Sequence, residues 1–246
     1  MRTIFLSAAF AALALGANAQ NISFGVEAGV NLNSLRTTIL EEKTKSSTKA
    51  GPRAAVFANI GFGEQLGLQV GLAYSQKGGK NDLNSSVTTG AGNNSVKIED
   101  VNSGETTISY IELPVNVVYH FNNEQSGFFL MAGAYGALAV SGKSQSLGGT
   151  TTTTTVVNGG APTVKVETTQ KGEKEDLEIG GDENSDQIRR FDLGFQAGAG
   201  YQTKMGLLFR AQYILGAMNI SNYNNSLFST RTSAIALTVG YRFGGR

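Results

Sequence analysis

The amino-acid sequence predicts an all-β fold: an eight-stranded antiparallel up-and-down transmembrane β-barrel with short periplasmic turns and long extracellular loops. Three observations predict it. Apolar residues recur at every second position in eight segments. Most of these segments exceed the about 5–6 residues of a soluble strand and match the about 9–11 residues of a tilted membrane strand. The links between them alternate strictly between short and long, as in bacterial outer-membrane barrels.

The eight segments differ in how cleanly they alternate. Residues 21–33 (NISFGVEAGVNLN) do so without exception, with apolar side chains on one face and polar or small ones on the other. Residues 127–141 are ambiguous, because both faces carry apolar or small side chains. The other predicted strands cover about 51–62, 66–75, 110–121, 189–203, 206–215 and 231–243.

The links fall into two length classes. The short links are residues 63–65, 122–126 and 204–205, and the long links are about 34–50, 76–107, 142–187 and 217–230. A soluble barrel has no physical reason to sort its links in this way. Residues 150–170 contain β-prone arms around an Asn-Gly turn and predict a hairpin that extends the strands 127–141 and 189–203. Residues 85–100 have two interpretations, a similar hairpin or a mobile polar loop.

The N-terminus predicts export. Arg2 precedes a short apolar stretch, and Ala17-Asn18-Ala19 fits the small-x-small cleavage rule, so we expect a cleaved signal peptide over 1–19 and a barrel domain over 20–246. The chain has no Cys, which excludes disulfides and thiolate metal sites. Its formal charge of +1 gives no reason to expect nucleic-acid binding.

Aromatic residues gather at the predicted short-turn rim. Their amphipathic rings suit the headgroup level of a membrane, so we expect a periplasmic girdle. A soluble sandwich with these rings in its core is the alternative, but it would not collect most of them at one end. The predicted girdle comprises Phe24, Phe62, Tyr119, Phe121, Phe128, Tyr201, Tyr241 and Phe243.

The polar face of the strands is expected to line the lumen, because a charge facing lipid at mid-membrane costs up to about 2–4 kcal/mol. Eight strands leave an interior just wide enough for side chains, which favours a structural plug of ion pairs over a selectivity filter. We expect Glu112 to pair with Arg210 first and Glu27 with Arg210 second. The predicted lumen charge network is Glu27, Arg53, Glu112, Arg190, Asp192, Arg210 and Arg242.

Pro114 lies inside a predicted strand, although proline cannot donate to a ladder. We therefore expect a bulge or a locally missing hydrogen bond at this position.

Three stretches together resemble a known family: YIELPVNVVYHF (110–121), FDLGFQAGAGYQT (191–203) and LTVGYRF (237–243). The chain resembles the outer-membrane β-barrel proteins common in Bacteroidetes, often called PorT-like. The resemblance covers nearly all of the mature chain and implies an eight-stranded barrel of mostly unassigned function. Some members of that family serve protein secretion. The sequence departs from the family at its end, where Gly-Gly-Arg follows the aromatic Phe243.

No catalytic, metal or cofactor site is expected. The sole histidine, His120, falls near the short-turn end, and no nucleophile motif or metal-spaced histidine cluster occurs. Asp182, Asn184 and Asp186 resemble part of a calcium loop, but the spaced glycine and distal glutamate of that loop are missing. Solvated charge is the favoured interpretation of this acidic stretch.

The sequence thus predicts a non-enzymatic outer-membrane protein with a filled lumen, whose long loops serve interaction or envelope integrity. A small pore or an accessory in transport or secretion is the alternative, and a soluble barrel around an apolar ligand is a third interpretation. The expected partners are outer-membrane lipid and lipopolysaccharide, the barrel-assembly machinery, and an extracellular or envelope protein.

Overall fold

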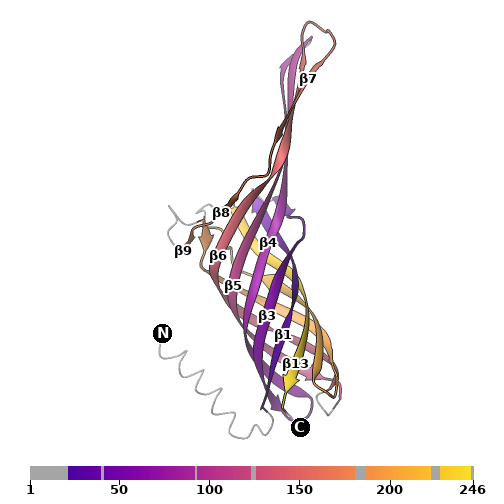
Figure 1. Ribbon diagram of the computed structural model, residues 1–246, viewed down its shortest axis with the longest axis vertical. Helices are drawn as coiled ribbons and strands as arrows, with labels where there is room; N and C mark the ends of the chain where they lie inside the picture. The colour runs from indigo at the N-terminus through magenta and orange to yellow at the C-terminus, as the bar shows by residue number, and fades with distance from the viewer. Residues whose placement is uncertain are drawn as a thin grey trace.

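The computed structural model describes residues 22–39, 42–91, 93–122, 126–180, 187–222 and 228–244. The expected signal peptide at 1–19 therefore lies outside the described residues. The described chain is almost entirely β-strand and turn (Figure 1). It contains no helix that is long and apolar enough to cross a membrane.

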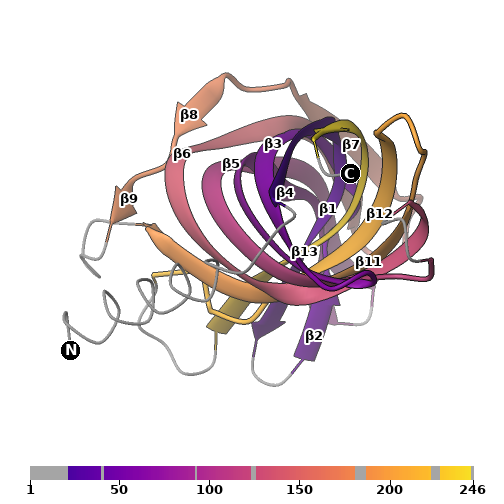
Figure 2. The same cartoon turned by 90° about the horizontal axis from the view of Figure 1, so that it is seen from below.

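Eight strands form a closed antiparallel barrel, seen end-on in Figure 2. Each strand pairs with the next one around the ring, and β11 closes the ring against β6. Each of the eight predicted segments falls on one of these strands and extends past the strand's end by at most two residues, so the fold class is confirmed. The barrel strands are β1 (Ile22–Ile39), β3 (Lys49–Phe62), β4 (Leu66–Ala91), β5 (Asn94–His120), β6 (Gly127–Val156), β11 (Phe191–Gln202), β12 (Leu207–Gly216) and β13 (Phe228–Phe243).

The strands are strongly tilted. Following the paired residues once around the barrel from Phe24 leads back to β1 at Ser34, ten positions further along the same strand. A shift of this size in an eight-stranded barrel corresponds to a tilt of about 35–45° and to an interior that side chains fill. The tilt decides which inward side chains lie at the same depth.

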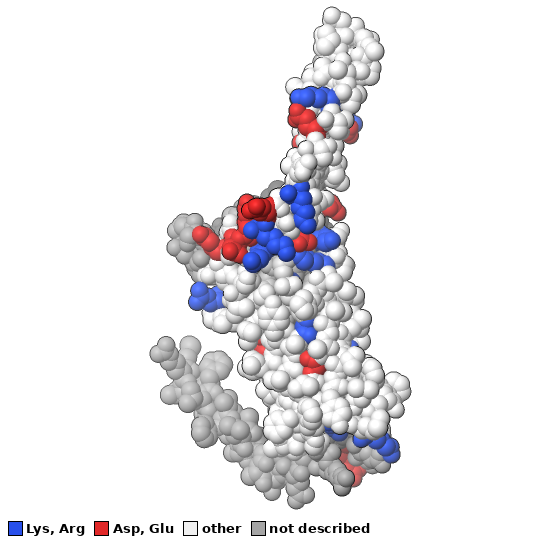
Figure 3. Space-filling view, viewed as in Figure 1, with Lys and Arg blue, Asp and Glu red and all other residues white. Residues whose placement is uncertain are grey.

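Short turns close the periplasmic end. Gly63 and Gly206 have positive φ angles of 81° and 94°, a conformation that glycine adopts without steric cost. On the face shown in Figure 3, charged side chains gather near the two ends of the barrel, and few lie in the band between them.

The long strands continue far beyond the barrel as a narrow arm (Figure 1). We call this structure the arm. It consists of residues 82–91 of β4, 94–103 of β5, 149–156 of β6 and the strand β7 (Thr163–Thr169). The segment 85–100 is therefore a hairpin rather than a loop. The hairpin at 150–170 is present too, but its returning strand β7 is not continuous with β11.

Four short strands complete the outer end. They are β2 (Glu42–Lys45), which pairs with β1, β8 (Lys174–Asp176), which pairs with β6, and the parallel pair β9 (Ile179–Gly180) and β10 (Ile188–Arg189). The strands β8, β9 and β10 lie between β7 and β11 in the chain, which explains why the predicted hairpin does not run straight back into the barrel.

Pro114 interrupts the ladder between β4 and β5 without changing its register. Val70 pairs with Val115 and Ala73 pairs with Glu112, whereas the two positions between them, Leu113 and Pro114, have no paired residue on β4. The expected missing hydrogen bond is thus found and the alternative, a bulge, is not. The register shifts of β5 occur earlier in the strand and in its pairing with β6, at Ser103/Gly104 and Ser109/Tyr110.

Candidate functional site: the barrel lumen

The barrel sorts its side chains by the period of two. On β11, for example, exposed Phe191, Leu193 and Phe195 alternate with buried Asp192 and Gln196. Because the outer surface faces acyl chains, the polar residues of each strand are directed into the lumen. The lumen is therefore where the charged chemistry of the barrel collects.

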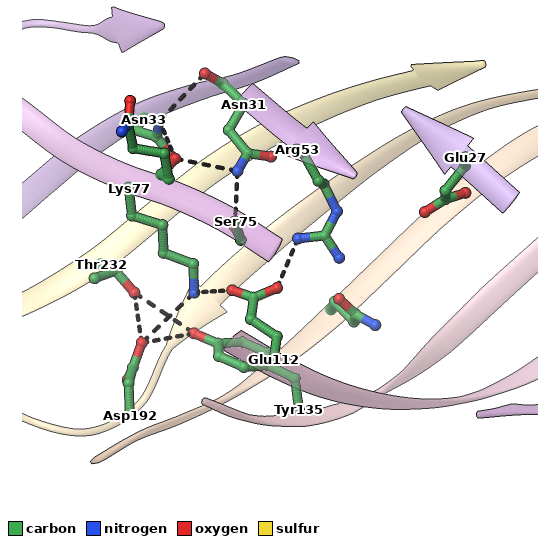
Figure 4. Close-up of polar contacts among 12 residues, drawn as sticks. Glu27, Asn31, Asn33, Arg53, Ser75, Lys77, Glu112, Tyr135, Asp192 and Thr232 are labelled. Atoms are coloured by element: carbon green, nitrogen blue, oxygen red, sulfur yellow. Dashed lines mark hydrogen bonds and ion pairs between the residues drawn. The ribbon is translucent and has the colours of Figure 1, made fainter. Parts of the chain in front are cut away.

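The outer half of the lumen holds an ion cluster centred on Glu112 of β5 (Figure 4). Arg53 Nη1 lies 2.6 Å from Glu112 Oε2, and Lys77 Nζ lies 2.8 Å from Glu112 Oε1. Lys77 Nζ is also 3.6 Å from Asp192 Oδ2, so this lysine bridges two carboxylates. All four side chains are at most 1% exposed.

Hydroxyl groups complete the cluster. Tyr135 Oη and Thr232 Oγ1 donate hydrogen bonds to Asp192 Oδ2 over 3.1 and 3.0 Å. The Tyr135 ring also packs under Lys77, with Nζ 4.1 Å from the ring centroid. The charges and their hydroxyl partners come from six strands, β3, β4, β5, β6, β11 and β13, so the cluster joins opposite walls of the barrel.

A second ion pair lies closer to the periplasm. Arg210 Nη1 of β12 is 3.0 Å from Glu27 Oε2 of β1, and Thr238 Oγ1 donates to the same oxygen over 3.4 Å. The Arg210 guanidinium also lies over the rings of Phe57 and Phe129, 5.5 and 5.8 Å from their centroids. Phe57 and Phe129 belong to an apolar layer with Val118, Met131 and Leu208.

The two groups together are electrically balanced. Three cations, Arg53, Lys77 and Arg210, face the three anions Glu27, Glu112 and Asp192. Balance matters because a buried ion without a counter-charge costs several kcal/mol, whereas a paired one recovers much of that cost.

Glycine makes room for the large side chains of the lumen. A Cβ on Gly194 would lie 2.6 Å from Tyr135 Cε1, and a Cβ on Gly200 would collide with the Phe129 ring. These two β11 glycines therefore let rings from neighbouring β6 fill the bore.

The structure places six of the seven predicted lumen residues inside the barrel and corrects the seventh. Arg190 is exposed, and its Nη2 contacts the carbonyl oxygen of Ile179 over 3.4 Å. It precedes the first residue of β11, at the outer end of the lumen, where water solvates it. Arg242 is buried near the periplasmic mouth, apart from the ion cluster.

One expected ion pair is present and the other is wrong. Glu27 pairs with Arg210, but Glu112 pairs with Arg53 and Lys77 instead. The reason is the tilt of the strands. Register places Glu112 opposite Ala73 and Ala73 opposite Ala55, one inward position from Arg53, while Arg210 lies deeper at the level of Glu27.

Lys77 is the functional residue that the sequence analysis missed. It falls in the predicted loop 76–107, yet the structure has it on β4 and 2% exposed. Its position in the alternation indicates where it lies. Gln69, Ala73 and Ser75 occupy the inward face of β4, and Lys77 is the next residue of that face.

The eight predicted girdle rings all point outward. They lie near the short turns, and three pairs are in edge contact: Tyr119 with Phe121, Phe128 with Tyr201, and Tyr241 with Phe243. Phe24 is paired opposite Phe243, so the ring set continues across the β1–β13 seam. Their role as an interfacial belt stays a prediction.

The described residues hold no group of three or more His, Cys, Asp or Glu side chains that is suited to a metal ion. The acidic stretch with Asp182, Asn184 and Asp186 lies outside the described residues. His120 is buried near the periplasmic mouth, with its ring 5.5 Å from Phe129.

A closed ring of eight strands, with an apolar outer surface and a charged lumen, defines an integral β-barrel protein of the outer membrane. The family model for the outer membrane protein beta-barrel domain matches residues 18–222, and the chain belongs to that family. No curated protein matches the chain.

Solved outer-membrane barrels resemble the fold at low sequence identity. Ail of Yersinia pestis is 12% identical with a TM-score of 0.41, and the alignment covers 91% of this chain and 100% of that one. The Neisserial surface protein A is 13% identical with a TM-score of 0.39, at the same coverage. The protease OmpT of Escherichia coli is 9% identical with a TM-score of 0.34, over 92% of this chain and 97% of that one.

Proposed function

We propose that the protein is a non-enzymatic outer-membrane barrel with a side-chain-filled lumen, whose arm presents a surface for interaction or envelope integrity. The observation that carries this proposal is the ion cluster around Glu112, which links opposite walls of the lumen. Arg53 and Lys77 each approach a carboxylate oxygen of Glu112 to less than 3 Å. A lumen crossed in this way offers no continuous path for ions.

The arm supports the second half of the proposal. In the described chain, β4 beyond Lys80 pairs only with β5, and β7 pairs only with β6. The arm therefore has two edges with unpaired backbone groups, to which an extended segment of another protein can add as a further strand. An extracellular or envelope protein is the partner that such edges fit, alongside the surrounding lipid and lipopolysaccharide.

The non-enzymatic half rests on where the reactive groups lie. The carboxylates Glu27, Glu112 and Asp192 are each engaged by a cation and buried, and His120 is at the opposite end from the long loops. A general acid or base needs reach to a substrate in a cleft, which these positions do not offer.

Planar-bilayer recording of the purified protein tests the filled lumen. We expect no steady conductance from the natural chain. The matched variants are Lys77→Met with Glu112→Gln in the lumen and Lys165→Met with Glu167→Gln in the arm. Only the lumen variant should show current. Reproducible channels from the natural chain would overturn the proposal.

Crosslinking in intact outer membranes tests the arm. The natural chain is compared with a variant in which residues 84–101 and 150–168 are each replaced by Asn-Gly, which favours a two-residue hairpin turn. We expect a crosslinked protein partner with the natural chain and its loss with the armless variant. The same partner on both chains would show that the arm does not present the surface.

A small pore or an accessory in transport or secretion is the second candidate, favoured by one observation. A small void of about 10 Å³ lies in the middle of the lumen, on the periplasmic side of the Glu112 cluster. If this void belongs to a path, replacing Arg210 by Met should change ion selectivity in the same recordings. Indifference to that change would dismiss the pore.

A further inference from the structure

The arm has an edge strand, β7, with no neighbouring strand on its outer side among the described residues. It pairs with β6 through seven residues, Thr163 to Thr169, and with no other described strand. Every one of these seven residues is exposed. The backbone N–H and C=O groups of β7 that point away from β6 are therefore available to a further strand.

The two charges of β7 have opposite signs and lie on one face of the strand. Lys165 Nζ lies 2.5 Å from Glu167 Oε1, and the two side chains are 72% and 63% exposed. Val166 lies between them and points to the other face, together with Val164, and both valines are exposed. A cation and an anion are thus placed symmetrically about Val166.

This arrangement makes β7 complementary to itself. In an antiparallel pair of two β7 strands, centred on Val166, Lys165 of each copy lies opposite Glu167 of the other. Val166 lies opposite its own copy on the other face, and Val164 lies opposite Thr168. Sliding one strand by two residues in either direction brings Lys165 or Glu167 opposite its own copy, and like charges placed directly across a ladder destabilise it. The charges therefore select one register.

The other strands of the arm do not offer such a surface. Residues 82–91 of β4, the opposite edge, carry a single charge, Asp82, at the base of the arm. Lys97 and Glu99 form a similar ion pair on β5, but β5 is already paired on both sides, with β4 and β6. The strand at which a second copy fits is therefore β7.

The direction of the strands decides where the second copy lies. The arm extends away from the barrel along the long axis of the molecule (Figure 1). Two copies in one membrane hold their arms in the same direction, so their β7 strands would run parallel and, in register, place like charges side by side. An antiparallel pair needs two arms that point towards each other, from barrels in two facing membranes.

We propose that β7 joins two copies of this chain across facing outer membranes, through an antiparallel ladder centred on Val166. This inference rests on the proposed function, in which the arm presents a surface for interaction, and it names the partner. Backbone hydrogen bonds supply affinity, and the pairs between Lys165 and Glu167 supply register and partner choice. One exposed charge pair contributes little, but many arms between two surfaces act together.

Two populations of vesicles with different fluorophores, each carrying the full-length mature barrel, test the pairing when they are mixed. We expect the natural chain to give clusters that contain both fluorophores. Lys165→Glu or Glu167→Lys, present on both populations, should abolish clustering because like charges then meet in the ladder. Mixing Lys165→Glu vesicles with Glu167→Lys vesicles should restore it, since two anions then face two cations.

The matched controls make the same charge changes on β5. Lys97→Glu and Glu99→Lys should leave clustering intact, and heat-modifiable gel migration shows whether each barrel is folded. Clustering that both β7 variants retain would overturn the proposal. Stronger clustering of the double variant Lys165→Met with Glu167→Gln would also overturn it, because the two charges would then protect the edge from pairing.

An introduced cysteine supplies a second readout, since the chain has no Cys of its own. Val166→Cys should give a disulfide-linked dimer between differently tagged chains of the two populations. Val164→Cys should give none, because that position lies opposite Thr168. Absence of the Val166→Cys dimer and of clustering by the natural chain would overturn the pairing. The proposed function would then still stand if the arm crosslinked a different protein in intact membranes.

Discussion

The barrel and the arm are built from the same strands but obey different rules. In the barrel part of β6, residues 128–140, burial largely alternates from one residue to the next, whereas residues 149–156 of the same strand are all half-exposed. The β7 strand beside them is exposed throughout. A strand between lipid and lumen must separate two environments, and a strand in water on both faces need not. The contrast shows that alternation records the surroundings of a strand rather than the strand itself.

The two regions also use charge differently. Glu112 is fully buried between two cations, while Lys97 and Glu99 in the arm pair with both side chains nearly half exposed. Buried pairs are strongly destabilising to break, because one uncompensated ion is left behind, whereas exposed pairs contribute little. Mutations in the lumen should therefore cost far more stability than mutations in the arm.

The largest effect is expected from Glu112→Ala. It leaves Arg53 and Lys77 without their shared carboxylate, so the free energy of unfolding should fall by about 3–5 kcal/mol. Glu99→Ala in the arm is the control and should change it by less than about 1 kcal/mol. Urea unfolding in vesicles measures the free energy of unfolding of both variants. Equal decreases in the two variants would show that ion pairs in the lumen and in the arm do not differ.

Glycine substitutions should separate the regions by packing. Gly194→Ala places a Cβ against the carbonyl oxygen of Leu215 and 2.6 Å from Tyr135 Cε1, and we expect a loss of about 1–3 kcal/mol from overpacking. At Gly104, on β5 near the base of the arm, the nearest atom to an added Cβ is 3.7 Å away. Gly104→Ala should leave stability within about 0.5 kcal/mol. If thermal unfolding shifts equally in both variants, the lumen is not tightly packed around Gly194.

A smaller, pH-dependent effect is expected just outside the membrane. Burial tends to raise the pKa of Glu105, but the hydrogen bond and charge of Lys49, with Lys80 and Lys171 further off, outweigh it and lower the pKa below 4.5. The Lys49–Glu105 contact of 3.1 Å therefore stabilises the fold above pH 4.5, and its contribution is lost as pH falls through the lowered pKa.

The variant Lys49→Met isolates this contribution. It should be less stable than the natural chain at pH 7, and the difference should shrink towards strongly acidic pH. Unfolding midpoints at pH 7 and at acidic pH check the trend. A difference that grows on acidification would give the interaction the opposite sign.

The smallest effect on the barrel is expected from removing the arm. Replacing residues 84–101 and 150–168 by Asn-Gly turns deletes exposed strands. It leaves in place every pairing of the barrel from Gly104 to the periplasmic end. The heat-modifiable gel migration of the folded barrel should be retained. Its loss would mean that the arm supports the barrel.

Sequence reasoning found the barrel because lipid imposes a simple rule on alternate residues. It placed Glu27 and Asp192 correctly in the lumen for the same reason. It paired Glu112 with the wrong arginine, since depth in a tilted barrel depends on register between distant strands, which periodicity does not contain. Lys77 escaped prediction because β4 continues past the apolar alternation of residues 66–75, and Arg190 was wrongly placed in the lumen because it lies just outside β11.

Alternate barrel residues face acyl chains, whereas the arm stands in water. The chain has no Trp, so a single introduced Trp reports on its own position. In vesicles of lipids brominated near the middle of the acyl chain, Leu237→Trp should be strongly quenched and Val166→Trp should not. Quenching at Val166 without quenching at Leu237 would contradict the account.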